Sequence, residues 1–222
     1  MPQIHQFRDY FRSPVGQKAI MAVTGTILML FAIQHVLGNL LIYQSASNLN
    51  RYAIFLKDKP GILWPARIVL FVSVVLHIIT ATKLTLKAKH ARPVGYAKLD
   101  PQGSTLGSRT IRAGGVILLF FIVFHIMHLT IGAILPQDFM PMDVYGNVVR
   151  GFQVWWVAAV YLIGMIALGL HLYHGFWASP RTLGLEPPYA PRHRPIPQIL
   201  ALLVWGAFTS IPVAVIIGYL HL

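Results

Sequence analysis

The sequence predicts an all-α fold, an integral membrane bundle of five transmembrane helices that forms one domain over residues 1–222. Of the 222 residues, 56% are hydrophobic and only 11% are charged, whereas an ordinary soluble domain carries about 25% charged residues. Five apolar stretches are each long enough to cross a bilayer, which takes about 20 helical residues. All six acidic residues lie outside these stretches.

The five spans are predicted at residues 17–44, 62–86, 112–136, 153–178 and 197–220. The connection from about 88 to 111 is long and basic and contains several prolines and glycines. The segment from Pro180 to Pro197 holds six prolines, so it is predicted to be extended and non-helical. Both connections are candidate docking surfaces for a soluble partner; solvated loops that face lipid are the alternative.

The distribution of basic residues predicts a cytoplasmic N-terminus and a C-terminus outside. Most of the 18 Lys and Arg residues lie in the N-terminal arm and in the connections between spans two and three and between spans four and five. Loops rich in these residues stay in the cytoplasm. The formal net charge of +12 is therefore attributed to loops that face anionic lipid or a partner protein, and not to nucleic-acid binding.

Each of the first four spans contains a histidine, an expensive residue in hydrocarbon and therefore a candidate functional residue. The chain has no cysteine, which excludes a thiolate-ligated iron–sulfur cluster or a Cys-type zinc site. Any electron-carrying metal must be held by histidine, and four helices with one imidazole each favour two bis-histidine haems. Packing against a neighbouring helix is the alternative for any single one. The four residues are His35, His77, His125 and His171.

The depth of each histidine predicts how the four combine. A helix rises about 1.5 Å per residue, so His77 and His171 lie roughly 15 Å from the nearest cytoplasmic charges. His35 and His125 lie roughly 20–25 Å from them. We therefore call His77 with His171 the inner pair and His35 with His125 the outer pair. The two levels differ by about 5–10 Å, which suits electron transfer between two haems stacked across the membrane.

Two further histidines and four basic residues are candidates for secondary contacts. His128 is one helical turn from His125, and His174 is one turn from His171, so each could share a face with its neighbour. Either could contact a haem propionate or a quinone. Basic partners for propionates are expected near the membrane surfaces, with snorkelling lipid anchors as the alternative. The candidates are Lys83, Arg112 and Arg181 inside and Arg67 outside.

Seven short motifs follow one another along the chain: Ser13–Lys18, Met21–Gly25, Gln34–Leu40, Asn50–Ala53, Phe124–His128, His171–Trp177 and Thr182–Gly184. In this order they resemble the single-chain, five-helix cytochrome b subunit of succinate dehydrogenase and fumarate reductase, the di-haem membrane anchor of complex II. The resemblance covers almost the whole chain. It departs after Trp177, where Ala178-Ser179-Pro180-Arg181 replaces the more usual Ser-x-Phe-Gln.

The resemblance implies that the axial ligands of two haem b irons are His35, His77, His125 and His171. It pairs the first span with the third and the second with the fourth, as the depths do. It also selects His125 over His128 and His171 over His174. The implied protein is the anchor subunit of a succinate dehydrogenase (succinate:quinone oxidoreductase) of the respiratory chain and the tricarboxylic acid cycle. This subunit has no succinate-binding site of its own.

The implied partners are a flavoprotein subunit, which carries FAD, and an iron–sulfur subunit, both on the cytoplasmic side of a bacterial inner membrane. Electrons from succinate would pass through the iron–sulfur clusters and then the inner and outer haems to a quinone. Menaquinone is the expected species. No nucleic acid is expected as a partner.

Two other classes of protein stay open at this point. A cytochrome b anchor of another respiratory enzyme, of the hydrogenase or formate dehydrogenase type, also uses several helices and histidine ligands. The stretch from His35 to Asn39 and the five-span layout fit that class poorly. A transporter or a haem-free structural anchor is the other class, but transporters tend to have internal repeats and broken helices, and the sequence shows neither.

Overall fold

The computed structural model describes residues 9–91, 94, 105–186 and 195–222. The regular structure in these residues is helical, and they contain no strand. Five helical segments are long and apolar enough to cross a membrane, at Pro14–Tyr43, Pro60–His90, Leu106–Asp138, Trp155–Thr182 and Pro195–Ile216. The prediction of an all-α chain with five membrane-length helices is confirmed.

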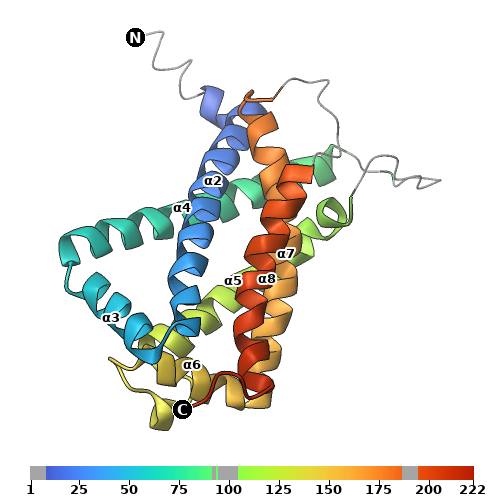
Figure 1. Ribbon diagram of the computed structural model, residues 1–222. Helices are drawn as coiled ribbons and strands as arrows, with labels where there is room; N and C mark the ends of the chain where they lie inside the picture. Colours follow the sequence, from blue (N-terminus) through green and yellow to red (C-terminus); the bar gives the residue numbers. More distant parts are fainter. Residues whose placement is uncertain (1–8, 92–93, 95–104, 187–194) are drawn as a thin grey trace.

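The helices follow one another as α2 (Pro14–Asn39), η1 (Leu40–Tyr43), α3 (Ala46–Lys57), α4 (Pro60–His90), α5 (Leu106–Ile126), η2 (Met127–Ile131), η3 (Pro136–Asp138), α6 (Val144–Gln153), α7 (Trp155–Thr182) and α8 (Pro195–Ile216). The five long helices alternate in direction, so the start of α2 and the C-terminus lie at opposite ends of the bundle (Figure 1). We call these the N-terminal end and the C-terminal end. Which end faces the cytoplasm is not fixed by the fold.

Side chains close the first turns of several helices. The hydroxyl of Ser13 accepts from the Gly16 amide at 3.1 Å at the start of α2. At the start of α5, Thr105 and Ser108 form a reciprocal capping box. Such caps satisfy amide groups that have no partner within the helix, and they fix where each helix begins.

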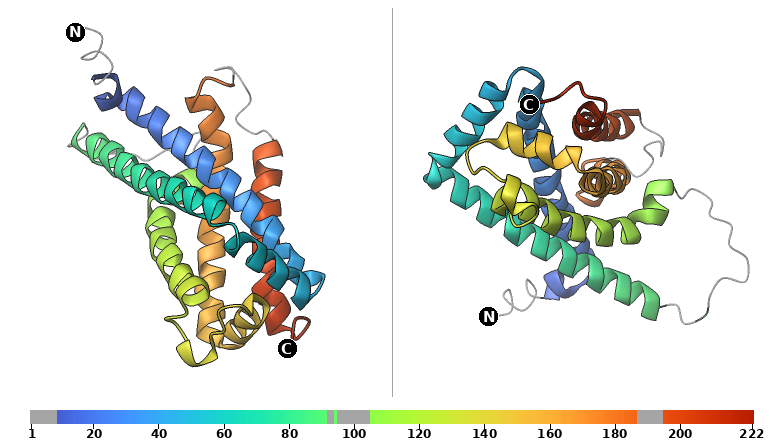
Figure 2. Two further views of the ribbon diagram at one scale, coloured as in Figure 1. Left: turned by 90° about the vertical axis from the view of Figure 1, so that its left-hand side faces the viewer. Right: turned by 90° about the horizontal axis from the view of Figure 1, so that it is seen from below.

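The long helices pack unevenly. α2 packs against α4 and α7, α5 packs against α7, and α7 packs against α8. α2 and α4 lie side by side and slant across α7 (Figure 2). Neither hydrophobic core cluster includes a residue of α4, whose buried side chains are only Ser73 and Thr80. Apolar side chains turned outward and small polar ones turned inward are the pattern expected of a helix in lipid.

Two short helices at the C-terminal end, α3 and α6, were not predicted from the sequence. Both lie in connections between spans, and Figure 1 shows them closing that end of the bundle. The Asn50 side chain joins them, because its amide donates to Asp143 at 3.1 Å and its oxygen accepts from the Tyr145 amide at 2.9 Å. Leu49 of α3 and Val149 of α6 belong to the larger core cluster, which also includes Tyr161 of α7.

The prediction of an extended, non-helical segment from Pro180 to Pro197 is wrong at both ends. Pro180 lies in the last turns of α7, and Pro195 and Pro197 lie in the first turn of α8. A proline in the first turn removes an amide that would have no helical partner, so the helix tolerates it. The central part, residues 187–194, lies outside the described residues, as do 92–93 and 95–104 of the long basic connection.

Several span boundaries also differ from the prediction. α4 continues past residue 86 to His90, and α5 begins at Leu106 rather than at residue 112. The fifth span was predicted to reach residue 220, but α8 ends at Ile216. Gly218 there has a φ of 78°, a left-handed conformation that glycine adopts without strain and that terminates a helix.

Candidate functional site

The four histidines of the first four spans lie next to one another in two pairs. The ring centroids of His77 on α4 and His171 on α7 are 6.1 Å apart. Those of His35 on α2 and His125 on α5 are 5.9 Å apart. These are the combinations that the depths predict. Their role as haem ligands stays a prediction.

The paired rings reach across helices that are not closely packed. Neither α4 with α7 nor α2 with α5 is among the closely packed helix pairs in the described part of the chain. Each pair of rings therefore meets between helices whose backbones are not in close contact. A flat group held between two helices requires this kind of spacing.

The separation within each pair is compatible with two imidazoles that share one metal ion, and it also lies in the range of ordinary contacts between rings. A ligating nitrogen lies about 2.0–2.1 Å from the metal, so two rings on opposite sides of one ion have centroids roughly 6.4 Å apart. Rings joined by a direct N–H···N hydrogen bond would be closer, at roughly 5.2 Å. The described residues show no hydrogen bond between the rings of either pair.

In the inner pair, His77 has hydrogen-bond partners at Nδ1 and His171 has none there among the described residues. Nδ1 of His77 donates to the Met21 carbonyl at 3.1 Å, and the Thr24 hydroxyl lies 3.3 Å from the same nitrogen. A proton on Nδ1 leaves Nε2 with its lone pair, which is the form that binds a metal. Nδ1 of His171 is buried and has no hydrogen-bond partner among the described residues.

Glycines flank the inner pair on two neighbouring helices. A Cβ at Gly25 of α2 would lie 3.1 Å from Cε1 of His77, and one at Gly115 of α5 would lie 3.9 Å from Cε1 of His171. A side chain at Gly25 would crowd His77, whereas one at Gly115 would make only an ordinary contact with His171. Gly38 has a different role, because a Cβ there would lie 2.6 Å from the Tyr52 ring and would block the packing of α3.

Aromatic side chains surround the outer pair. The ring of Phe31 stacks on His35 with a centroid distance of 5.2 Å and an interplanar angle of 14°. Phe208 of α8 approaches the same imidazole at 5.8 Å. The Asn39 amide nitrogen lies 3.4 Å from Nε2 of His35, near the limit for a hydrogen bond. A metal bound to that nitrogen would replace this weak contact.

Tyr161 of α7 connects His125 to His128. Its hydroxyl lies 3.2 Å from Nδ1 of His125 and 3.0 Å from Nδ1 of His128. The sequence analysis did not identify this residue. The available signal was that Tyr161 carries the one hydroxyl between Trp155 and Leu170, because a buried tyrosine hydroxyl usually has a hydrogen-bond partner.

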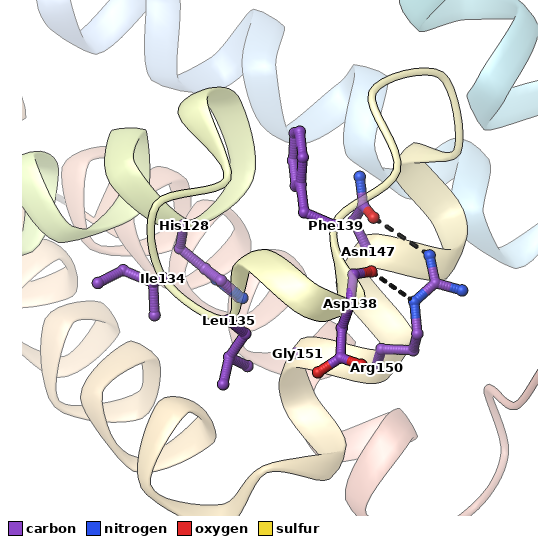
Figure 3. Close-up of a pocket in the computed structure, with 8 residues that line it drawn as sticks. All are labelled: His128, Ile134, Leu135, Asp138, Phe139, Asn147, Arg150 and Gly151. Carbon is purple, nitrogen blue, oxygen red and sulfur yellow. Dashed lines mark hydrogen bonds between the residues drawn. The ribbon is translucent and has the colours of Figure 1, made fainter.

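His128 lies in the π-helix η2 and points into a hollow at the C-terminal end of the bundle (Figure 3). The hollow is small, with a volume of about 10 Å³, which is room for about one water molecule. Its other lining residues are Ile134, Leu135, Asp138, Phe139, Asn147, Arg150 and Gly151. His174, the corresponding neighbour of His171, is only partly buried, and its ring lies 6.3 Å from that of Trp177.

An ion pair stabilises the outer wall of this hollow. Arg150 binds the Asp143 carboxylate at 3.0 Å and also donates to the Asn147 side chain and the Asp138 carbonyl. Burial raises the pKa of Asp143, but hydrogen bonds from the Gly146 amide, Asn50 and Arg150, together with the charge of Arg150, outweigh it. The net effect holds the pKa of this carboxyl below its ordinary value.

The four basic candidates for propionate contacts lie in different surroundings. Arg67 stacks over Trp64, with its guanidinium carbon 5.3 Å from the ring centroid. Arg181 forms an ion pair with Glu186 at 3.2 Å and lies 4.5 Å above the Trp177 ring. A propionate role for any of the four stays a prediction. Three of the four candidates are exposed, Arg67, Lys83 and Arg112.

Ser179 connects α7 to α2. It belongs to the stretch Ala178–Arg181, where the sequence departs from the resemblance described above. The buried Ser179 hydroxyl forms a hydrogen bond of 2.6 Å with Thr26 and donates to the Ala22 carbonyl at 3.1 Å. This contact stabilises the N-terminal end of the bundle close to the inner pair. Arg181 in the same segment is engaged with Glu186.

The donor set fits a metal that needs only two ligands from the protein. Among the described residues, no group of three or more His, Cys, Asp or Glu side chains could hold a metal ion. A structural zinc site normally takes four protein ligands, whereas haem iron takes axial ligands only. A site with two imidazoles as its only protein ligands therefore fits haem better than zinc.

Comparison of this chain with protein families, with curated proteins and with solved structures finds no match.

Proposed function

We propose that this chain is the di-haem cytochrome b membrane-anchor subunit of a bacterial succinate:quinone oxidoreductase. The observation that carries the proposal is the meeting of four imidazoles, from four different membrane-length helices, in two pairs with centroids 6.1 and 5.9 Å apart. The ordered motifs that resemble the complex II anchor support the choice of enzyme. A single packed histidine would explain one such contact but not two pairs.

In this proposal His77 and His171 hold one haem b, and His35 and His125 hold the other. When bound, each haem supplies a one-electron carrier within the membrane. The protein's own part is to orient the imidazoles, to keep water away from them and to space the two sites across the bilayer. The Met21 carbonyl orients His77, and the Tyr161 hydroxyl orients His125.

The flavoprotein and iron–sulfur subunits are proposed to bind the N-terminal end of the bundle, which is assigned to the cytoplasm. The support is electrostatic, because Lys87 and Lys89 lie in the last turn of α4 and Arg109 and Arg112 lie near the start of α5. Basic residues favour the cytoplasmic side. Succinate oxidation belongs to those subunits, and the acceptor in the membrane is a quinone, menaquinone in this proposal.

The test is a reduced-minus-oxidised optical spectrum with haem quantitation on the purified complex. We expect two b haems per chain in the wild type and loss of mainly one in each of His77→Ala and His35→Ala. His90→Ala is the matched control, since His90 is exposed on α4 and its Nδ1 bonds to the Leu86 carbonyl of its own helix. A wild-type protein without haem would overturn the proposal.

The partners that co-purify identify the enzyme. A flavoprotein and an iron–sulfur protein would support succinate:quinone oxidoreductase. A subunit that carries nickel or molybdenum would instead assign the chain to a hydrogenase or formate dehydrogenase.

A further inference from the structure

The hydroxyl of Tyr161 lies between two imidazoles in a closed aromatic environment. Tyr161 is 5% exposed and His128 is 3% exposed. The rings of Phe152 and Phe121 lie 4.7 and 5.2 Å from the Tyr161 ring, both nearly perpendicular to it. These contacts fix the direction of the tyrosine side chain. Its hydroxyl therefore has two partners within hydrogen-bond distance, Nδ1 of His125 and Nδ1 of His128.

We propose that Tyr161 and His128 are positioning residues that set the orientation and the tautomer of His125. The inference rests on the proposed function, in which His125 is a ligand of the outer haem. Neither Tyr161 nor His128 touches the metal in this arrangement. They act through His125, as hydrogen-bond partners of metal-bound histidines generally do.

Binding of a metal by His125 would determine which group donates and which accepts in each of these two hydrogen bonds. If His125 binds iron through Nε2, its Nδ1 carries a proton and donates to the Tyr161 oxygen. A tyrosine hydroxyl can accept one hydrogen bond and donate another, so Tyr161 then donates its own proton to Nδ1 of His128. The Nδ1–H of His125 and the Tyr161 hydroxyl then both have a partner, which matters because unsatisfied buried polar groups are costly.

The position of His128 is built into the neighbouring backbone. A Cβ at Gly151 of α6 would lie 2.5 Å from Nε2 and from Cε1 of His128, so only glycine leaves room for the ring. His128 also lies in the π-helix Met127–Ile131, a conformation that is frequent at functional sites. The wall formed by α6 therefore holds His128 against Tyr161.

This arrangement has an electronic consequence for the outer site. An acceptor at Nδ1–H makes the imidazole a more basic ligand, which favours the oxidised metal. Removal of the tyrosine hydroxyl should therefore raise the midpoint potential of the outer haem. The inner haem should be unaffected, because His77 donates to the Met21 carbonyl instead.

The experiment is a redox titration of the purified complex that carries Tyr161→Phe, with each haem followed by its own absorption band and by electron paramagnetic resonance. This substitution keeps the ring and removes only the hydroxyl. We expect both haems to stay bound, with a several-fold fall in the oxidised to reduced ratio of the outer haem at a fixed solution potential. A tenfold change in that ratio corresponds to about 59 mV for one electron.

Two further variants and a control sharpen the test. In His128→Asn the amide oxygen can replace Nδ1 as acceptor, so the outer potential should stay near the wild-type value. In His128→Leu the acceptor is lost, and the potential should rise by less than in Tyr161→Phe. Tyr43→Phe is the control, because that hydroxyl donates to Ser210 at 2.8 Å and contacts no imidazole.

The outcomes separate this inference from the proposed function. Two haems in Tyr161→Phe with an unchanged outer potential, or with an equal shift of both haems, would overturn the inference and leave the function intact. A wild-type complex without haem would overturn the function itself. If Tyr161→Phe does not assemble, equal outer potentials in His128→Leu and His128→Asn would overturn the inference.

Discussion

The inner and outer histidine pairs have similar ring separations, 6.1 and 5.9 Å, but their surroundings differ. The inner pair joins α4 to α7, and a backbone carbonyl of α2 positions His77. The outer pair joins α2 to α5, and a tyrosine side chain of α7 positions His125. In each case the hydrogen-bond partner of the imidazole comes from a third helix.

The two pairs differ more in the packing around them than in their hydrogen-bond partners. The outer pair lies against aromatic rings, and Tyr161, which contacts it, belongs to the larger core cluster. The inner pair depends on α4, whose buried side chains are only Ser73 and Thr80. Packing against aromatic rings and the hydrogen bond with Tyr161 therefore together preorganise the outer pair. The geometry of the inner pair depends on a few polar contacts and on glycines that leave space beside the rings.

The largest expected effect is the loss of one haem when a ligand is removed. His171→Ala should lose the inner haem and His125→Ala the outer one, each halving the haem content per chain, because one axial imidazole alone holds the group weakly. His174→Ala tests the neighbouring histidine and should retain both haems. Haem loss in His174→Ala but not in His171→Ala would reassign the inner ligand.

The second effect is steric and should be larger beside the outer pair. A Cβ at Gly164 would overlap the Phe121 ring, which approaches His125, whereas one at Gly25 would lie 3.1 Å from His77. Overpacking a filled core costs about 1–3 kcal/mol, so Gly164→Ala should lower the thermal stability more than Gly25→Ala. Gly206→Ala, with nothing within 4 Å, is the control. Equal midpoints for all three variants would contradict the difference in packing.

The third expected effect is a shift in haem midpoint potential when a hydroxyl beside an imidazole is removed. Thr24→Val removes a hydroxyl that lies 3.3 Å from Nδ1 of His77, but the Met21 carbonyl at 3.1 Å is still there to accept. The inner potential should therefore shift less in Thr24→Val than the outer potential shifts in Tyr161→Phe. Redox titration of both variants measures this order. The reverse order would mean that Thr24 is the main partner of His77.

The smallest effect concerns Asp143, which caps α6 and pairs with Arg150 at the C-terminal end. Asp143→Asn keeps a cap oxygen but loses the ion pair, and a partly exposed pair is worth about 1 kcal/mol or less. Because the pKa of Asp143 is lowered in the folded protein, its stabilisation is present above the ordinary value of 3.8. It is lost as the pH falls through the folded-state pKa.

Thermal unfolding of the wild type and of Asp143→Asn at two pH values tests this linkage. The wild type should be the more stable protein near neutral pH, and the difference should shrink as the pH falls below the ordinary carboxyl pKa of 3.8. A difference that grows on acidification would show that the carboxylate is not stabilised by its partners.

The number of membrane-length helices and the histidines that share a level could be predicted from the sequence. Bilayer thickness fixes the length of an apolar helix, and a constant rise converts residue number into depth. His77 could therefore be matched with His171, and His35 with His125, without knowledge of which helices are neighbours. The boundary errors have a local cause, since the lysines at the end of α4 are tolerated in a helix and proline is tolerated in a first turn.

The lateral arrangement of the helices could not be predicted from the sequence and became visible in the folded chain. Depth along a helix does not give its rotation or its neighbours, so neither the Tyr161 hydroxyl beside His125 nor the Met21 carbonyl beside His77 followed from the sequence. Helices α3 and α6 were missed for a related reason. They are too short to cross a bilayer, and they are stabilised by long-range contacts, such as those of Asn50 with Asp143 and Tyr145, that exist only in the folded chain.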